Sequence, residues 1–197
     1  MGVVSPQLGR RPSTTRAVIS EVAIDLFTRH GFDETSVDDV AEAAGIARRT
    51  LFRYYPSKNA IPWGDFDVHL EAMRSHLDAL GDDLPVAVAL QTALVEFNRV
   101  DADHLDSHRR RMRLLLEVPA LQAHSMLMYT GWRDVIADFV ARRTGVSRDE
   151  HLPQTAGWLM LGVALAAYEQ WLTDPAADLA ALLTDGSRIL DRGLRAL

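Results

Sequence analysis

The segment from residue 35 to residue 58, TSVDDVAEAAGIARRTLFRYYPSK, constrains the fold more than any other part of this 197-residue chain. It reads as two short helices that a tight turn at Gly45 separates. Thr35 or Ser36, with an aspartate three positions later, predicts a capping box at the start of the first helix. Pro56 predicts the end of the second, because proline cannot supply the next backbone N–H. This pattern is typical of a helix-turn-helix, whose second helix docks in the major groove of DNA.

The second of these helices, predicted from about Arg48 to Tyr55, carries the side chains that can contact DNA. Helical spacing places Leu51 and Tyr55 on its inner face. Arginine forks suit guanine edges, and basic or hydroxyl side chains suit phosphates. Lys58 is expected at the start of the following helix, where the helix dipole also favours an anion. We therefore expect DNA contacts from Arg48, Arg49, Thr50, Arg53, Tyr54 and Lys58. The alternative is a basic face that contacts only water.

A further helix is predicted before this motif, from about Ser13 to His30, with a left-handed cap at Gly31. Its apolar residues recur at i, i+3 and i+4 spacing, which indicates one inward-facing stripe. The stripe comprises Val18, Val22 and Leu26 with Ile19, Ala23 and Phe27. Residues 13–58 thus form a predicted three-helix DNA-binding domain, which we call the head.

Residues 1–12 are predicted to form a mobile arm that precedes the head. Arg10 and Arg11, together with Arg16, either enter a flanking minor groove or belong to an unstructured tail. The charge distribution agrees with DNA binding although the whole chain carries a net charge of −6. Residues 1–60 hold eight basic and seven acidic side chains, whereas the rest of the chain holds 13 basic and 20 acidic ones. An acidic body below a near-neutral head keeps the body away from the phosphates.

From Ser57 onward the pattern is helical throughout, and no stretch alternates as a strand would. Pro and Gly positions divide residues 59–197 into five or six amphipathic helices, which we call the body. A long helix from about Ser57 to Leu80 joins the two parts, and the step at Pro62–Gly64 is expected to bend or interrupt it. The predicted fold is all-α, with a helix-turn-helix head, a ligand-binding and dimerisation bundle, and eight or nine helices in total.

Composition excludes several other classes of protein. The chain has no cysteine, so disulfide frameworks and thiol catalysis are excluded. No apolar run approaches the ~20 residues that span a bilayer, and the N-terminus lacks the apolar core of a signal peptide. We therefore expect a cytoplasmic protein without a membrane partner. No nucleophile, metalloprotease or phosphate-loop motif occurs, which argues against an enzyme and gives no indication of a cofactor. A helical adaptor that binds proteins is the remaining alternative.

The residues of the head resemble the TetR-type one-component regulators of bacterial transcription. The similarity covers about residues 14–60 and is closest in AIDLFTRHGFDETSVDDVAEAAGIARRTLFRYYPSK. Two positions depart from the commonest pattern of that family: Ala47 stands where a serine or threonine often caps the recognition helix, and Phe52 replaces a usual tyrosine. Membership would imply a homodimer that binds a palindromic operator on double-stranded DNA, most often as a repressor, and responds to a small molecule.

The step PWGDFD, residues 62–67, and the closing helices are also similar to regulators of the mycofactocin gene cluster in actinobacteria. That resemblance would imply a long-chain acyl-CoA as the effector. The alternative is an effector of another class, such as a hydrophobic drug or a lipid-like inducer. In either case the ligand has an apolar tail.

The body contains many large, soft side chains, and apolar clefts between helices are where small molecules bind. Core packing is the simpler explanation for each such residue taken singly. Taken together, we expect a pocket among the helices of the body whose lining includes Trp63, Phe66, Met73, Met112, Met128 and Trp132.

Two polar clusters in the body admit more than one interpretation. His104 and His108 lie four residues apart among three aspartates, which is a spacing that can bind a metal, although a solvated polar cluster is the simpler interpretation. The following run, residues 109–113, contains four arginines. One face of that run could receive an acidic ligand such as a CoA phosphate, or the run could form an ordinary charged helix surface.

The last two helices, predicted over about residues 153–173 and 176–197, carry more apolar surface than one side of a fold needs. The family resemblance implies that this pair meets its twin in a four-helix dimer interface. A monomeric core is the alternative. The residues expected in that interface are Trp158, Leu161, Leu165, Tyr168, Leu172, Leu182, Leu183, Ile189 and Leu190.

Overall fold

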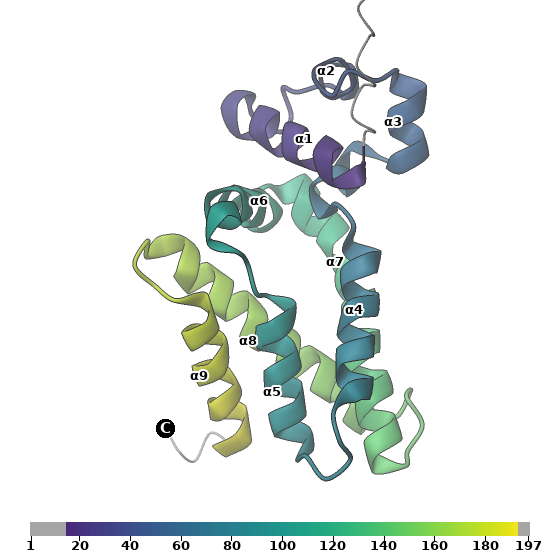
Figure 1. Cartoon of the computed structure of the whole chain (residues 1–197), viewed down its shortest axis with the longest axis vertical. Coiled ribbons are helices and arrows are strands. Elements are labelled where there is room, and N and C mark those ends of the chain that lie inside the picture. The colour runs from purple at the N-terminus through teal and green to yellow at the C-terminus, as the bar shows by residue number, and fades with distance from the viewer. Residues whose placement is uncertain (1–14, 193–197) are drawn as a thin grey trace, which may run out of the picture.

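The computed structural model describes residues 15–192, and within this range all regular structure is helical. The head lies at one end of an elongated molecule and the helices of the body extend away from it (Figure 1). Nine α-helices and two 3₁₀ helices follow one another in the described range. They are α1 (Arg16–His30), α2 (Val37–Ala43), α3 (Arg48–Tyr54), η1 (Lys58–Trp63), α4 (Phe66–Ala79), α5 (Val86–Phe97), η2 (Ala102–His104), α6 (Leu105–Glu117), α7 (Pro119–Thr144), α8 (His151–Thr173) and α9 (Leu179–Arg192). The predicted all-α class is confirmed. The arm at residues 1–12 lies outside the described residues.

Local sequence signals explain the start of the first two helices. The Thr15 side chain accepts a hydrogen bond from the Val18 backbone N–H and caps α1. At α2, Ser36 and Asp39 form the predicted capping box, in which each side chain bonds the other residue's backbone N–H. Gly31 ends α1 with φ 91° and ψ 148°, so its φ is positive as predicted but its conformation is extended rather than left-handed helical.

The recognition helix α3 starts without such a cap, because Ala47 has no side-chain acceptor. It ends at Tyr54, one residue before the predicted end, and Tyr55 is already extended ahead of Pro56. Leu51 and Tyr55 both face inward and are at most 1 % exposed, as predicted. The Tyr55 hydroxyl donates a 2.7 Å hydrogen bond to the Arg16 carbonyl oxygen, which fixes the end of α3 against the start of α1.

The connection between head and body is interrupted rather than bent. The 3₁₀ helix η1 contains Pro62 and ends at Gly64, which has φ 58° and ψ −130° and therefore favours glycine. The α-helix α4 begins only at Phe66. Proline removes one backbone donor inside this segment, so a continuous α-helix across it would lose a hydrogen bond. The predicted helix from 57 to 80 is thus split into two elements.

The body has its own core. It lies between α4, α5, α7, α8 and α9, and its largest buried members include Trp171, Leu77, Leu94, Ile136 and Leu183. The helices α7 and α8 pack along much of their length, and α9 closes the outer side against α5 and α8. Among residues 15–192, no helix combines the length and the apolar character that a membrane crossing requires.

A second core lies in the head and extends into the body. It contains Ile24, Phe27 and Leu51 of the head together with Leu114 of α6 and Leu121 of α7. The helix α6 packs directly against α1 (Figure 1). Apolar packing therefore couples the head to the body over a surface broader than the connecting segment. A movement of α6 would strain the packing of α1.

Candidate functional site

The outer face of α3 carries the side chains that were predicted to contact DNA. Arg48, Arg49 and Arg53 are exposed, and Thr50 and Tyr54 are partly exposed. Leu51 is buried on the opposite face of α3, so these five side chains lie on the side of α3 that faces away from the core of the head. Figure 1 shows α3 at one edge of the head. The surface formed by residues 48, 49, 50, 53 and 54 is called the α3 face below.

Two arginines of the α3 face are held by neighbours. Arg48 pairs with Asp38 of α2, with 2.5 Å between Nη1 and Oδ2, and its guanidinium lies 5.5 Å from the centre of the Phe52 ring. Arg53 lies 5.8 Å from the Tyr54 ring centre. Phe52 stands where the TetR-type pattern usually has a tyrosine, yet its ring still contacts the guanidinium of Arg48. These contacts hold the two guanidinium groups in place before a partner binds, which lowers the conformational entropy that is lost on binding.

Lys58 is placed differently from the prediction. It begins the 3₁₀ helix η1 rather than an α-helix, so the expected help from an α-helix dipole is absent. Its ammonium lies 4.2 Å above the ring centre of Phe32 and 5.9 Å from that of Phe27. Partial burial lowers the pKa of Lys58 below its ordinary value, whereas the nearby Asp33 raises it. Lys58 therefore contacts the aromatic core of the head, and a phosphate contact from it stays a prediction.

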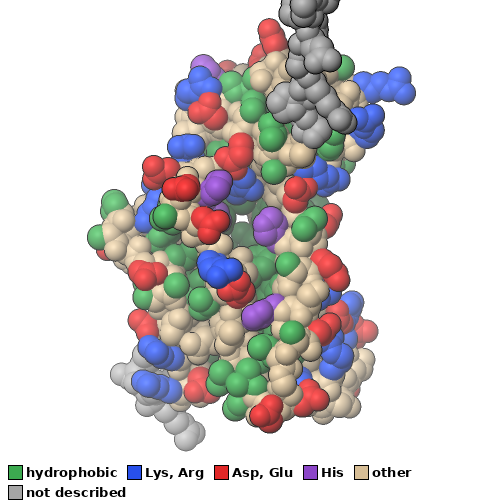
Figure 2. Space-filling view, viewed as in Figure 1, with side chains coloured by type: hydrophobic (Ala, Val, Ile, Leu, Met, Phe, Trp, Pro, Cys, Tyr) green, Lys and Arg blue, Asp and Glu red, His purple; other side chains and the backbone are tan. Residues whose placement is uncertain are grey.

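A cavity of about 390 Å³ lies beneath the head, between α1, η1, α4, α6, α7 and α8. Of the six residues predicted to line a pocket, Trp63, Phe66, Met112 and Trp132 line this cavity. Met73 is instead buried in the body core, and Met128 is half-buried on α7 away from the cavity. Figure 2 shows the molecule hollowed at this level, with histidine, basic and acidic side chains around the opening.

One wall of the cavity is a continuous series of aromatic rings in edge-to-face contact. Trp63 meets Phe66 at 4.7 Å and Tyr129 at 5.6 Å between ring centres. Phe66 meets Phe97 at 6.2 Å, and Phe97 meets Trp132 at the same distance. Such pairs are stabilising beyond the area they bury, so the wall is a preformed apolar surface. Alkyl chains are suited to it.

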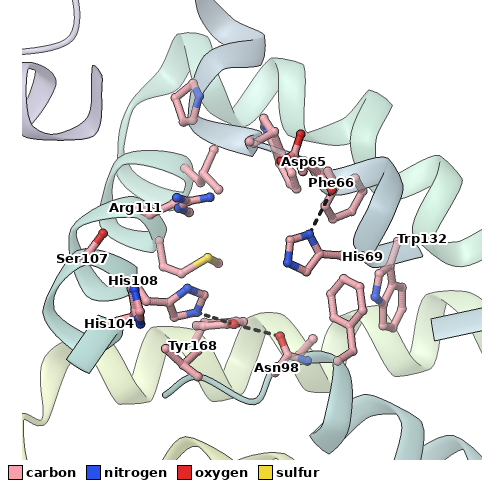
Figure 3. A pocket seen from close by; sticks show the side chains of 18 of the residues that line it. Asp65, Phe66, His69, Asn98, His104, Ser107, His108, Arg111, Trp132 and Tyr168 are labelled. Carbon is pink, nitrogen blue, oxygen red and sulfur yellow. Dashed lines mark hydrogen bonds between the residues drawn. The ribbon is translucent and has the colours of Figure 1, made fainter. Parts of the chain in front are cut away.

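The opposite wall contains a chain of three polar side chains (Figure 3). The Asn98 amide N–H donates 2.7 Å to the Leu94 carbonyl oxygen, which leaves its Oδ1 to accept from the Tyr168 hydroxyl at 2.8 Å. Since that hydroxyl proton is used, His108 Nε2 must donate to the Tyr168 oxygen, 2.9 Å away. Burial and the Arg111 charge lower the pKa of His108 from 6.5 to about 4. His108 is therefore neutral at pH 7, with its Nδ1 as an acceptor.

The four arginines of the run in the middle of α6 lie in different environments. Arg111 lines the cavity (Figure 3). Arg109 stacks 3.9 Å from the Trp171 ring centre and donates to that residue's carbonyl oxygen. Arg113 donates 3.2 Å to the Leu172 carbonyl oxygen, and Arg110 is exposed. The run thus combines an ordinary charged helix surface with one arginine that faces the cavity.

His104 and His108 both line the cavity, but they do not share a ligand set. His108 bonds Tyr168 rather than the aspartates near it in sequence. Within the part of the chain that the structure describes, no group of three potential metal ligands gathers. His69 of α4 faces them across the cavity, and its Nδ1 lies 3.0 Å from the Asp65 carbonyl oxygen (Figure 3).

The residues predicted for a dimer interface fall into two groups. Four of them are inside the single chain and are unavailable to a second copy: Leu161, Tyr168, Leu172 and Leu183 are each at most 9 % exposed. The prediction for these four is corrected, and Leu161 and Tyr168 line the cavity instead. Leu161, Tyr168 and Leu172 are covered because α8 is apolar around most of its circumference and contacts α6, α7 and α9. Leu183 belongs to α9 and is part of the body core. The others are exposed (Trp158, Ile189 and Leu190) or half-buried (Leu165 and Leu182).

The exposed side of α8 forms an apolar surface that sequence reasoning identified only in part. Leu152, Trp158 and Leu159 are each about half exposed, and Gly162 and Ala166 continue the same helical stripe. The two closing helices adjoin closely, because a Cβ on Gly186 of α9 would lie 2.8 Å from Val163 of α8. We call the stripe formed by residues 152, 158, 159, 162 and 166 the α8 face.

Sequence reasoning missed several residues of the cavity. Glu21 of α1 lines it, although no motif in the sequence singles it out. Asn98 and His69 also line it, and neither belongs to a recognisable motif. The only signal for Arg111 was its membership of an arginine run. These residues come together because α1, α4, α6 and the end of α5 all border the cavity, which is a tertiary feature that local spacing does not encode.

A helix-turn-helix head joined to a helical body that holds an apolar cavity is typical of ligand-responsive DNA-binding transcriptional regulators. Comparison with known proteins agrees. Residues 19–61 match the family profile described as bacterial regulatory proteins, tetR family. Residues 84–195 match the profile described as the MftR C-terminal domain. The chain belongs to the TetR family of transcriptional regulators.

A relative that is more than half identical matches nearly the whole chain. It is a Mycobacterium tuberculosis protein to which the role of mycofactocin biosynthesis transcriptional regulator, MftR, has been assigned. The two sequences are 54 % identical over 188 residues, which is 95 % of each chain. The resemblance to that subgroup is thereby confirmed.

Solved structures show the same fold. Thermus thermophilus FadR, a TetR-family repressor in complex with lauroyl-CoA, superposes with a TM-score of 0.59 at 24 % identity, covering 91 % of this chain and 94 % of that one. Bacillus subtilis FadR in complex with stearoyl-CoA gives a TM-score of 0.63 at 16 % identity, covering 88 % and 96 %. At these identities the similarity establishes the architecture alone.

Proposed function

We propose that this protein is a homodimeric transcriptional repressor that binds a palindromic operator and is released from it by a long-chain acyl-CoA. The observation that carries the proposal is the position of the cavity. Residues of the head helix α1 line it together with residues of the body, including Ala17 and Glu21. A ligand in this cavity therefore touches the part of the molecule that carries the α3 face.

The lining of the cavity supports an effector with an apolar tail. The aromatic wall from Trp63 to Trp132 offers stacking and dispersion contacts to an alkyl chain. A volume of about 390 Å³ is near the lower end of the ~300–1,000 Å³ found for drug-sized ligands. Because an acyl-CoA is larger than such a ligand, the acyl chain enters and the nucleotide of coenzyme A stays at the opening. The two FadR structures bind acyl-CoA within the same architecture.

The α8 face supports the dimer. It leaves three large apolar side chains, Leu152, Trp158 and Leu159, about half exposed on one helix. A twofold axis along this face would bury them against their own copies, and Gly162 and Ala166 would permit close approach of the helices. Twofold symmetry then presents two α3 faces to successive major grooves, so the operator is palindromic. A chromosomal operator places the protein in the cytoplasm.

DNA binding is tested by anisotropy with labelled fragments from upstream of the protein's own gene and of mycofactocin biosynthesis genes. The 54 % identity to the mycobacterial protein motivates the second choice. We expect binding that resists excess non-specific DNA and weakens steeply with salt. Arg48→Ala combined with Arg49→Ala should abolish it. Arg142→Ala, an exposed arginine of α7 that pairs with Asp78, is the matched control and should leave it intact. If the protein binds no genomic fragment specifically, the proposal is contradicted.

Ligand binding is tested separately by tryptophan fluorescence, because Trp63 and Trp132 both line the cavity. Oleoyl-CoA should change the emission with a saturable dependence on concentration. Free coenzyme A should bind far more weakly, since it lacks the tail that the aromatic wall receives. A Trp132→Phe variant keeps the aromatic wall but should reduce the change in emission that oleoyl-CoA causes. Trp158→Phe, on the α8 face, should leave that change intact. Equal binding of coenzyme A with and without its acyl chain contradicts the assignment of the tail to the cavity.

A further inference from the structure

Arg111 joins the cavity to the head. Its Nη2 lies 2.5 Å from the Glu21 carboxylate of α1, and the Ser107 hydroxyl donates to the other oxygen of the same carboxylate. Both donors come from consecutive turns of α6. One acidic side chain of the head is therefore held at both oxygens by one helix of the body, and all three residues line the cavity.

Arg111 also lies against the turn that precedes α4. A Cβ added to Gly64 would be 3.0 Å from Arg111 Nη1, which is closer than ordinary contact. The guanidinium thus occupies the corner where α1, α6 and the η1–α4 turn meet. Any displacement of it changes contacts with two elements of the head–body junction at once.

Of the two arginines in the described lining of the cavity, Arg111 is the better shielded from solvent. Its side chain is 21 % exposed, whereas that of Arg99, at the rim, is 73 % exposed and pairs with Glu96. His108 is neutral at pH 7 because its pKa is about 4. A guanidinium has five N–H donors, and Glu21 accepts from only part of them. The remaining N–H groups can donate hydrogen bonds to an oxygen atom of a ligand.

We propose that Arg111 is shared in competition between Glu21 and an oxygen of the ligand, and that this competition transmits ligand occupancy to the head. The inference rests on the proposed function and names the contact that regulates it. The ligand class is an alkyl chain that ends in a hydrogen-bond-accepting oxygen, such as the carbonyl of an acyl thioester. That oxygen first bonds to the donors that Glu21 leaves open, and, because the tail is held against the aromatic wall, it draws the guanidinium away from Glu21 toward the cavity. The Arg111–Glu21 pair then opens, and α1 loses its charged attachment to α6.

The Glu21→Gln variant separates the competition from simple ligand binding. Glutamine keeps the shape of the side chain but removes the charge that attracts Arg111. We expect oleoyl-CoA to bind the DNA-free variant several-fold more tightly than the wild type, because no pair must open. At the same time, the factor by which oleoyl-CoA weakens operator binding should fall at least fivefold. Two titrations, by fluorescence and by anisotropy, measure the two quantities.

The Arg111→Met variant keeps an apolar stem and removes the donors. It should weaken oleoyl-CoA binding at least tenfold and abolish the effect of oleoyl-CoA on operator binding. Glu117→Gln is the matched control, because Glu117 pairs with Arg113 at 3.6 Å on the same helix but does not line the cavity. It should behave as the wild type in both titrations. Thermal unfolding of each variant shows that the fold is kept, and the Glu21→Gln result decides the matter if Arg111→Met does not fold.

The two proposals fail in different ways. A wild-type protein that binds its operator and releases it with oleoyl-CoA, while Glu21→Gln does so by the same factor, overturns the competition but leaves the proposed function intact. A wild-type protein whose operator binding ignores acyl-CoA overturns the proposed effector and the inference together. Both proposals are supported only if Glu21→Gln binds oleoyl-CoA more tightly than the wild type and, at the same time, oleoyl-CoA weakens its operator binding by a smaller factor.

Discussion

Arg48 shows how neighbouring side chains orient a single residue of the α3 face. Its guanidinium is attached to Asp38, which belongs to the preceding helix, and it also lies near the Phe52 ring. The pair is exposed on both sides, so its contribution to stability is small. Its effect is on orientation, because an arginine held in one direction discriminates among bases better than one that moves freely toward any phosphate.

The variant Asp38→Asn tests this role. It releases Arg48 and removes a negative charge beside the DNA, so non-specific binding should strengthen while the ratio of specific to non-specific affinity falls. The slope of log affinity against log salt should become steeper by about 0.9, as for one additional phosphate contact. Glu42→Gln is the control, since Glu42 is an exposed acid of α2 that forms no ion pair among the described residues. An unchanged specificity ratio in Asp38→Asn would contradict this role.

His108 gives the protein a predictable dependence on pH. Its pKa in the folded state, about 4, is below the ordinary value of 6.5, chiefly because the ring is buried, with Arg111 adding to the effect and Glu21 opposing it. The unfolded chain therefore binds a proton first as the pH falls. The contribution of neutral His108 to stability is fully present above pH 6.5 and is lost progressively as the pH falls toward 4.

This dependence can be isolated with His108→Gln, whose amide can still donate to Tyr168. We expect the free energy of unfolding of the wild type to fall more than that of the variant between pH 6.5 and pH 4. The difference is about 3 kcal/mol at most, from the size of the pKa shift. Urea unfolding at several pH values measures it. Parallel curves for the two proteins would show that His108 does not titrate in this way.

At the level of elements, the η1–α4 turn is the feature that the sequence predicted least completely. Pro62 and Gly64 indicated a bend or an interruption, and the structure shows an interruption. The conformation at Gly64 is unfavourable for any other residue, and Arg111 occupies the space that a side chain would need. The turn is therefore fixed both by its own backbone and by α6.

Gly64→Ala should destabilise the protein by about 1–3 kcal/mol, through backbone strain and displacement of Arg111. Gly45→Ala is the matched comparison, because Gly45 also has a positive φ of 66° but a Cβ there meets nothing within 4 Å. Both variants should unfold at lower urea concentration. Only Gly64→Ala should also change the affinity for oleoyl-CoA. If both variants bind oleoyl-CoA as the wild type does, the turn is not part of the ligand site.

Sequence periodicity predicted the helices well and the faces of the helices less well. The capping box at Ser36 is a local signal, and it was confirmed. In α1, however, Val18 is 50 % exposed although it belonged to the predicted inward stripe, while Ile24 is fully buried and was not included. The buried face of α1 differs from the predicted stripe because α1 packs against both α2 and α6. The contact with α6 cannot be predicted from the spacing of apolar residues within α1. The same limit explains why Tyr168 was assigned to an interface rather than to the cavity.

At the level of the whole molecule, the head and the body share a core, and the cavity lies at their boundary. This arrangement lets a ligand act on the head without any large internal rearrangement. Regulation also requires a second head, because a change in the orientation of one head alone does not prevent that head from fitting DNA. The twofold axis that we propose along the α8 face supplies that second head, since the spacing of two heads must match the operator.

The dimer is tested with Leu159→Glu, which places a charge at the centre of the α8 face. We expect the wild type to sediment as a dimer and the variant largely as a monomer, with operator affinity reduced at least tenfold. Leu127→Glu is the control, because Leu127 is even more exposed, at 70 %, but belongs to α7 and not to the α8 face. Sedimentation velocity at several concentrations measures the result. A variant that stays dimeric would place the interface elsewhere.

Linkage between the two ligands is the most direct test of the whole account. Calorimetry would measure oleoyl-CoA binding to the free protein and to the protein–operator complex, and anisotropy would measure operator binding with and without oleoyl-CoA. We predict that oleoyl-CoA binds the complex more weakly by the same factor by which it weakens operator binding, typically about 5- to 150-fold. If oleoyl-CoA binds the operator complex as tightly as the free protein, the cavity does not control DNA binding and the account is wrong.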